Sequence, residues 1–182
     1  MENGTAEKDR NETHHYNYKK GIDRQISWEE DTITHKIQQT KAFLVKYKDN
    51  VIDQSISKLE LKSSIDAATF VIGLPFTLNS SEISLTYEGL SDFQKTSCHT
   101  LKAMFSNSKD IWSLFYEEET LAWKGYWVQT PDHNNLVIND KMTEVNGFML
   151  PQKRTSYRTD SIKNITYKRA DYLYEDYLIE TN

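Results

Sequence analysis

Three groups of residues have types and spacings that could support chemistry. Cys98 and His99 place a thiol next to an imidazole, residues 117–119 are three consecutive glutamates, and aromatic side chains crowd residues 110–130. A nucleophile and its base must lie within hydrogen-bond reach of each other. Cys98 and His99 lie in residues 91–105, which are predicted to be helical, and neighbouring residues on a helix diverge by about 100°. Cys98 is therefore expected to be a small buried hydrophobic residue rather than a nucleophile.

The glutamates at 117–119 are expected to form a turn between two strands. Three consecutive glutamates could hold a cation, but strand alternation would point their carboxylates apart. The sequence contains no glycine-rich phosphate-binding loop, no GxSxG motif and no second cysteine. We therefore expect no metal site and no cofactor. An enzymatic function is disfavoured but stays open, because a pair of acid–base carboxylates would leave no local signature.

The aromatic side chains of residues 110–130 admit two interpretations. Trp112, Trp123, Tyr126 and Trp127 lie at strand spacing on either side of the glutamates, which predicts a hairpin at the centre of the core. The alternative is a small-molecule pocket lined by the same four residues. Stacking on nucleic acid is disfavoured, because Lys124 is the only basic residue in this segment.

Composition restricts the class of protein. The chain has 182 residues, 37% of them hydrophobic, and a net charge of -5, which argues against nucleic-acid binding. Its N-terminal residues are polar, without the apolar core of a secretory signal, and no apolar run is long enough to span a bilayer. A single cysteine favours a reducing compartment. We expect a cytoplasmic or nuclear protein.

Two helices are predicted in the first part of the chain. Ser27 begins a capping-box pattern, and the apolar residues that follow recur at spacings of three and four, which predicts a helix over 28–48 and permits a coiled coil. A second helix is predicted over 91–105. Between them, 69–78 and 83–87 alternate as a hairpin, with Pro75 at a sheet edge; a short helix over 65–72 is the rival.

The C-terminal residues are predicted to bind a partner. Residues 167–182 carry an apolar stripe at helical spacing, which predicts a terminal amphipathic helix. Such a helix either docks on its own domain or fits a groove on another protein. The expected partner-binding residues are Leu173, Tyr174, Tyr177, Leu178 and Pro75.

The expected domain organisation is a disordered tail at 1–25, a single α+β domain at 26–151, a linker at 152–166 and the terminal helix at 167–182. The domain would be an antiparallel sheet of about five or six strands, with a long N-terminal helix and one central helix packed on it. This order is similar to that of longin and roadblock modules and of nuclear transport factor-like folds.

The functional hypothesis is a non-enzymatic protein-binding subunit or adaptor of an intracellular complex. Its partners would be other proteins, a homo- or hetero-oligomer is compatible with this role, and it would not bind a membrane. A small-molecule-binding protein or enzyme with the aromatic pocket is the alternative.

Overall fold

The protein was examined as a computed structural model, which describes residues 12–17, 23–30, 33–38, 42–47, 50–53, 71–74, 78–79, 81–106 and 108–179. The chain divides into two compact units, residues 1–74 and 75–182. None of the helical structure within these ranges is long and apolar enough to cross a membrane.

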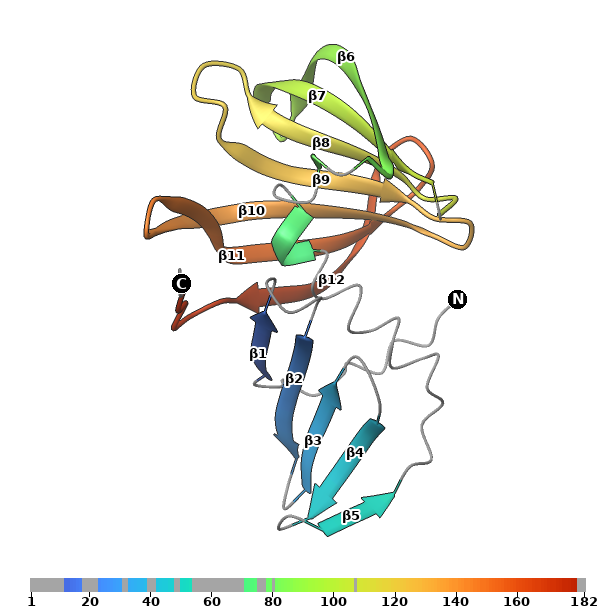
Figure 1. Cartoon of the computed structure of the whole chain (residues 1–182). Helices are drawn as coiled ribbons and strands as arrows, with labels where there is room; N and C mark the ends of the chain where they lie inside the picture. Colours follow the sequence, from blue (N-terminus) through green and yellow to red (C-terminus); the bar gives the residue numbers. More distant parts are fainter. Residues whose placement is uncertain are drawn as a thin grey trace. The chain divides into compact units, whose positions relative to one another are not determined.

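The second unit is a seven-stranded antiparallel sheet in which each strand pairs with its neighbours in sequence. The strand order in space is therefore the order along the chain, with β6 at one end and β12 at the other (Figure 1). The strands are β6 (Ile83–Phe93), β7 (Thr96–Phe105), β8 (Ile111–Glu117), β9 (Trp123–Gln129), β10 (Asn134–Val145), β11 (Phe148–Thr159) and β12 (Ile165–Leu173).

The first unit contains a five-stranded antiparallel sheet, also in sequence order. Its strands are β1 (Glu12–Asn17), β2 (Asp23–Glu30), β3 (Ile33–Gln38), β4 (Ala42–Tyr47) and β5 (Asn50–Asp53). Residues 71–74 form one helical turn. β1 lies inside the stretch 1–25 that the sequence predicted to be a disordered tail.

Both faces of the seven-stranded sheet carry buried side chains. One face holds the main apolar cluster, in which the rings of Phe93 and Phe115 stack with centroids 4.2 Å apart. The buried members of this cluster are Phe93, Cys98, Phe115, Trp127 and Leu136. The opposite face buries Leu114, Tyr126 and Trp123. The hairpin predicted over 110–130 is confirmed as β8–β9, at the centre of this core.

A bulge in this hairpin changes which aromatic residues share a face. The pairing of β8 with β9 shifts between Phe115 and Tyr116, so Trp123 pairs with Tyr116 instead of following the alternation of Trp127. Gly125 lies at this point with a φ of 151°, and a Cβ there would come 2.2 Å from the Val137 carbonyl oxygen. Regular strand alternation would place Trp123 and Trp127 on one face, and the bulge places them on opposite faces.

The predicted α+β fold is also wrong, since the described residues form antiparallel sheet with no long helix. Within the expected N-terminal helix over 28–48, the described residues belong to three strands, β2, β3 and β4, which pair in succession. The apolar residues of two short strands, β3 and β4, reproduced the three-and-four spacing of a helix. The coiled-coil interpretation required that helix and is therefore wrong as well.

The central helix predicted over 91–105 is the end of β6 followed by β7. The turn between them consists of Gln94 and Lys95, both with positive φ, at 52° and 66°. These two values match a tight hairpin turn that normally uses asparagine or glycine. Neither Gln94 nor Lys95 is a typical turn residue, so the sequence did not predict a hairpin here.

The remaining differences concern strands on either side of the core. The terminal helix over 167–182 is replaced by β12 and an irregular segment at 174–179. The expected linker at 152–166 contains most of β11, the turn after it and the start of β12. Of the strand predicted over 69–78, residues 71–74 are helical, and the rival helix over 65–72 lies mostly outside the described residues.

Candidate binding edge

The four residues of the predicted aromatic pocket lie on two faces of the sheet. Trp112, Tyr126 and Trp123 gather on one face, with ring centroids 5.1 Å and 6.3 Å apart in succession. Trp127 lies on the other face, where its indole N–H donates to Thr159 Oγ1 at 2.8 Å. Trp123, Tyr126 and Trp127 are buried, and burial raises the pKa of the Tyr126 hydroxyl. These rings pack as core, and they do not converge on one site.

The same face buries a cation, Arg154. Its Nε donates to Asn139 Oδ1 at 2.7 Å, and its guanidinium carbon lies 4.7 Å from the centroid of the Trp123 ring. Tyr174 contributes a second ring at 5.8 Å. A planar guanidinium is weakly hydrated and stacks well on aromatic rings, so this position tolerates arginine in the interior. A buried position for Arg154 was not predicted, since this residue fell in the expected linker.

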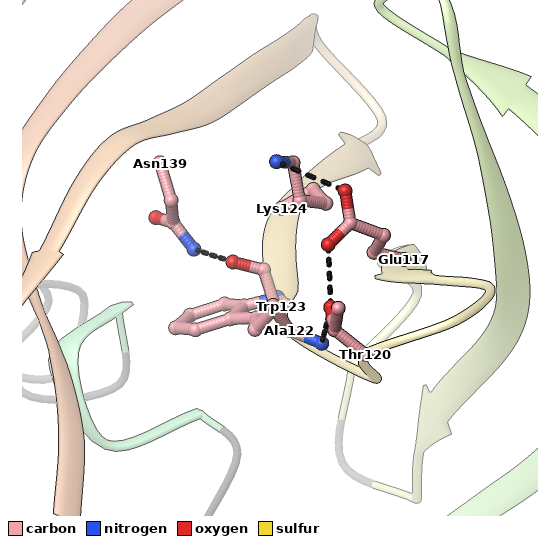
Figure 2. A network of polar contacts seen from close by, with 6 residues as sticks. All are labelled: Glu117, Thr120, Ala122, Trp123, Lys124 and Asn139. Carbon is pink, nitrogen blue, oxygen red and sulfur yellow. Dashed lines mark hydrogen bonds and ion pairs between the residues drawn. The ribbon is translucent and has the colours of Figure 1, made fainter.

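The glutamate turn is held by polar contacts at the end of β8 (Figure 2). The Thr120 hydroxyl donates to the Glu117 carboxylate, and Lys124 Nζ lies 3.7 Å from Glu117 Oε1. The hydrogen bond from Thr120, followed by the charge of Lys124, lowers the pKa of Glu117. Asn139 Nδ2 donates to the Trp123 carbonyl oxygen at 2.9 Å and ties β10 to this turn. Within the described residues, no three His, Cys, Asp or Glu side chains are arranged to hold a metal ion.

Cys98 is fully buried in the main apolar cluster, as predicted. Burial raises the pKa of its thiol, which disfavours the thiolate needed for nucleophilic attack. His99, the next residue on β7, belongs to the opposite face and shares a hydrogen bond of 2.9 Å with the Tyr87 hydroxyl. The cysteine and histidine therefore point apart, although on a strand rather than on a helix.

The expected partner-binding residues fall into three groups. Leu173 and Leu178 are exposed, at 65% and 81%. Tyr174 and Tyr177 are half-buried, and the Tyr177 hydroxyl donates to the Pro151 carbonyl oxygen at 2.6 Å. Pro75 lies outside the described residues. The terminal segment thus presents two leucines to solvent while its tyrosines hold it to β11.

The edge strand β6, which the pocket and terminal-helix hypotheses both overlooked, also exposes apolar side chains. Leu85, Tyr87 and Leu90 are 44%, 57% and 52% exposed. Residues 83–87, Ile-Ser-Leu-Thr-Tyr, form an uncharged stretch of high strand propensity, without proline or glycine. Among the residues that the structure describes, β6 pairs with β7 alone.

The hydrogen-bond pattern shows which backbone groups of β6 face outward. The Ser106 N–H donates to the Glu82 carbonyl oxygen at 3.0 Å, so Ile83 and Phe105 form a pair without direct hydrogen bonds. Antiparallel pairs alternate between hydrogen-bonded and non-hydrogen-bonded. It follows that the N–H and C=O groups of Ile83, Leu85 and Tyr87 point away from β7, and those of Ser84 and Thr86 point toward it.

The opposite edge of the sheet, β12, carries features that discourage pairing. It contains charged residues at 168, 169 and 171, and the Lys168 ammonium contacts the Asp171 carboxylate at 2.5 Å. Its pairing with β11 also has two register shifts. Charges and bulges on an edge strand protect it against the addition of another strand. Residues 83–87 of β6 have no such charge, and the bulge of β6 lies beyond them, between Tyr87 and Gly89.

Comparison with known proteins returned no matching family model, no similar curated protein and no similar solved structure.

Proposed function

We propose that this protein is a non-enzymatic protein-binding subunit of an intracellular complex, and that it binds a partner by adding a strand to the β6 edge. The observation that carries this proposal is the uncharged, exposed stretch 83–87, whose outward backbone groups lie at the end of a seven-stranded sheet. Extended segments commonly bind such edges through main-chain hydrogen bonds.

Side chains on β6 extend the surface beyond its backbone. Leu85 and Tyr87 lie on one face of the strand, and Leu90 returns to that face because of the bulge between Tyr87 and Gly89. Exposed apolar groups that lie together mark interaction sites more often than scattered ones do. A strand added to β6 would cover these side chains as well as the open backbone.

The other observations on the site agree with a binding role. The buried Cys98 and the separation of Trp127 from the other three pocket residues favour structural packing over a ligand cavity. The exposed leucines Leu173 and Leu178 lie outside the proposed binding edge, because the charged residues of β12 disfavour the addition of a strand there.

A pair of leucine substitutions tests the proposal. In Leu85→Lys, a charge is placed on the proposed edge, whereas Leu173→Lys places the same charge on β12, and both leucines are exposed in the structure. Tagged full-length protein carrying Leu85→Lys should lose its captured partners, since charged edge strands resist pairing. The Leu173→Lys control should retain them, with both variants folded by far-UV circular dichroism. Equal capture by both variants and the parent chain would refute the proposal.

A further inference from the structure

The acidic residues around the β6 edge define the chemistry of the strand that fits it. We infer that the partner segment is an extended strand with basic residues on both sides of a short alternating stretch, one face apolar and the other hydroxyl-bearing. This inference depends on the proposed function, because it names the segment that the β6 edge would receive.

The charge of β6 is entirely negative. Residues 82–93 contain Glu82, Glu88 and Asp92 and no lysine or arginine. Glu82 and Glu88 directly flank the uncharged stretch 83–87. Lys102 of β7 lies 4.0 Å from Glu88, but both side chains stay more than a third exposed, so this contact is solvated. Opposite charges at facing positions of adjacent strands stabilise the pair, and like charges destabilise it.

The two faces of the stretch differ in chemistry. Leu85 and Tyr87 lie on one face, and Ser84 and Thr86 on the other. Facing side chains of adjacent strands contact each other, and β-branched–aromatic pairs and hydroxyl pairs are favourable. The partner strand should therefore alternate valine or isoleucine with serine or threonine across this stretch.

A second copy of this chain fits the edge poorly. An antiparallel pairing of two β6 strands that superposes their uncharged stretches is centred on Leu85 and places Glu82 opposite Glu88 at both ends. Two-fold symmetry repeats each contact, so both like-charge pairs form together. The acidic residues thus select a different, basic segment.

Two synthetic peptides test the inference, both acetylated, amidated and fluorescently labelled. The first is Lys-Val-Thr-Val-Thr-Val-Lys, and the second has glutamate in place of both lysines. Anisotropy titration of the full chain at low salt should show the lysine peptide binding at least ~10-fold more tightly. Added salt should reduce this difference, because exposed charges are screened.

Charge reversal on the protein provides the matched control. The double variant Glu82→Lys, Glu88→Lys should prefer the glutamate peptide, provided that circular dichroism shows the parent fold. The double variant Glu82→Gln, Glu88→Gln should bind both peptides equally, and it avoids the repulsion that a lysine at position 88 would feel from Lys102. Equal affinity for both peptides in all three proteins would overturn the basic-partner inference while leaving strand addition intact.

Backbone methylation of the peptide separates that failure from failure of the proposed function. In an antiparallel pairing, the N–H of the central valine faces β6 and the N–H of the following threonine faces away. N-methylation of the valine should abolish binding, and N-methylation of the threonine should leave it. If both methylated peptides bind alike, or if neither parent peptide binds, strand addition at β6 is refuted together with the inference.

Discussion

Individual buried polar residues in this sheet depend on one another for hydrogen bonds. Asn139 connects three strands: its Nδ2 donates to the Trp123 carbonyl oxygen and its Oδ1 accepts from Arg154 Nε. Arg154 is fully buried, so its guanidinium depends on this amide and on the Trp123 ring more than a surface arginine would. A buried charged donor that loses its acceptor is costly.

Replacing Asn139 should therefore destabilise the fold more than replacing a similar residue nearby. We expect Asn139→Ala to lower the free energy of unfolding by about 2–3 kcal/mol, the cost of stranding a buried charged donor. Asn135 is the control, since its Oδ1 accepts from Arg158 Nη1 at 2.9 Å in a half-buried setting on the same strand. Asn135→Ala should cost about 1 kcal/mol. Urea unfolding of both variants measures the difference, and equal losses would contradict this account.

Glu117 should link stability to acid pH. The hydrogen bond from Thr120 lowers the pKa of Glu117 in the folded state, so its ionised form stabilises the fold above the pKa of an unfolded glutamate. This contribution is lost as the pH falls through the lowered folded pKa. The stability deficit of Glu117→Gln relative to the parent should thus be present at pH 7 and should shrink as the pH is lowered through the acid range. Thermal unfolding with Glu119→Gln as a charge-matched control measures it; a deficit that persists in acid would argue against the Thr120 contact.

At the scale of elements, the β8–β9 hairpin depends on one glycine. Gly125 has a φ of 151°, and a Cβ would meet the Val137 carbonyl oxygen at 2.2 Å and the Cα of Ile138 at 3.2 Å. Both contacts are with the backbone of β10, which side-chain rotation does not relieve. Adding a methyl group here would force β9 and β10 apart, next to the bulge that directs Trp123 and Trp127 to opposite faces.

We therefore expect Gly125→Ala to destabilise the fold by about 3 kcal/mol or more, from steric overlap and backbone strain together. Gly147 is the control because it also has a positive φ, 83°, but no atom lies within 4 Å of the position where a Cβ would be added. Gly147→Ala should cost only ~1 kcal/mol, the strain of a left-handed alanine. Thermal unfolding followed by tryptophan fluorescence compares the two, and similar melting temperatures would contradict the steric explanation.

The sequence predicted elements well where turn residues were explicit and aromatic residues dense. The β8–β9 hairpin was predicted from the spacing of its tryptophans and its glutamate turn. The β10–β11 hairpin turns at Asn146-Gly147, a residue pair typical of two-residue hairpin turns. Prediction failed where the turn residues were unmarked. Gln94 and Lys95 adopt positive φ without glycine or asparagine, and their hairpin was taken for a helix.

Apolar spacing also misled where strands are short. Ile33 and Ile37 lie on β3 and Leu44 and Tyr47 on β4, so a helical periodicity arose from two separate strands. The proposed binding edge was not predicted, since an edge is defined by which strands pair, and single-sequence patterns do not specify that pairing. The signal available beforehand was the uncharged alternation of residues 83–87.

At the scale of the molecule, the chain consists of two units, and the proposed function belongs to the second. Every strand of residues 75–182 pairs with a strand of the same unit, and the main apolar cluster lies entirely within it. Pairing between sequence neighbours keeps contacts local, which favours independent folding.

We expect residues 75–182 to fold when produced alone. The fragment keeps three of the four tryptophans, so its emission should be blue-shifted and its thermal unfolding cooperative. Far-UV circular dichroism and fluorescence melts check this. A fragment with red-shifted emission and no cooperative transition would show that the second unit depends on residues 1–74.

Amide hydrogen exchange along β6 tests the central claim most directly. In the full chain without a partner, the amides of Ile83, Leu85 and Tyr87 should exchange fast and those of Ser84 and Thr86 slowly, because only the latter point toward β7. Addition of the lysine-flanked peptide should protect the three fast amides and leave the slow ones unchanged. If Ile83, Leu85 and Tyr87 are already protected in the unbound chain, or stay unprotected when the peptide is saturating, β6 is not the binding edge.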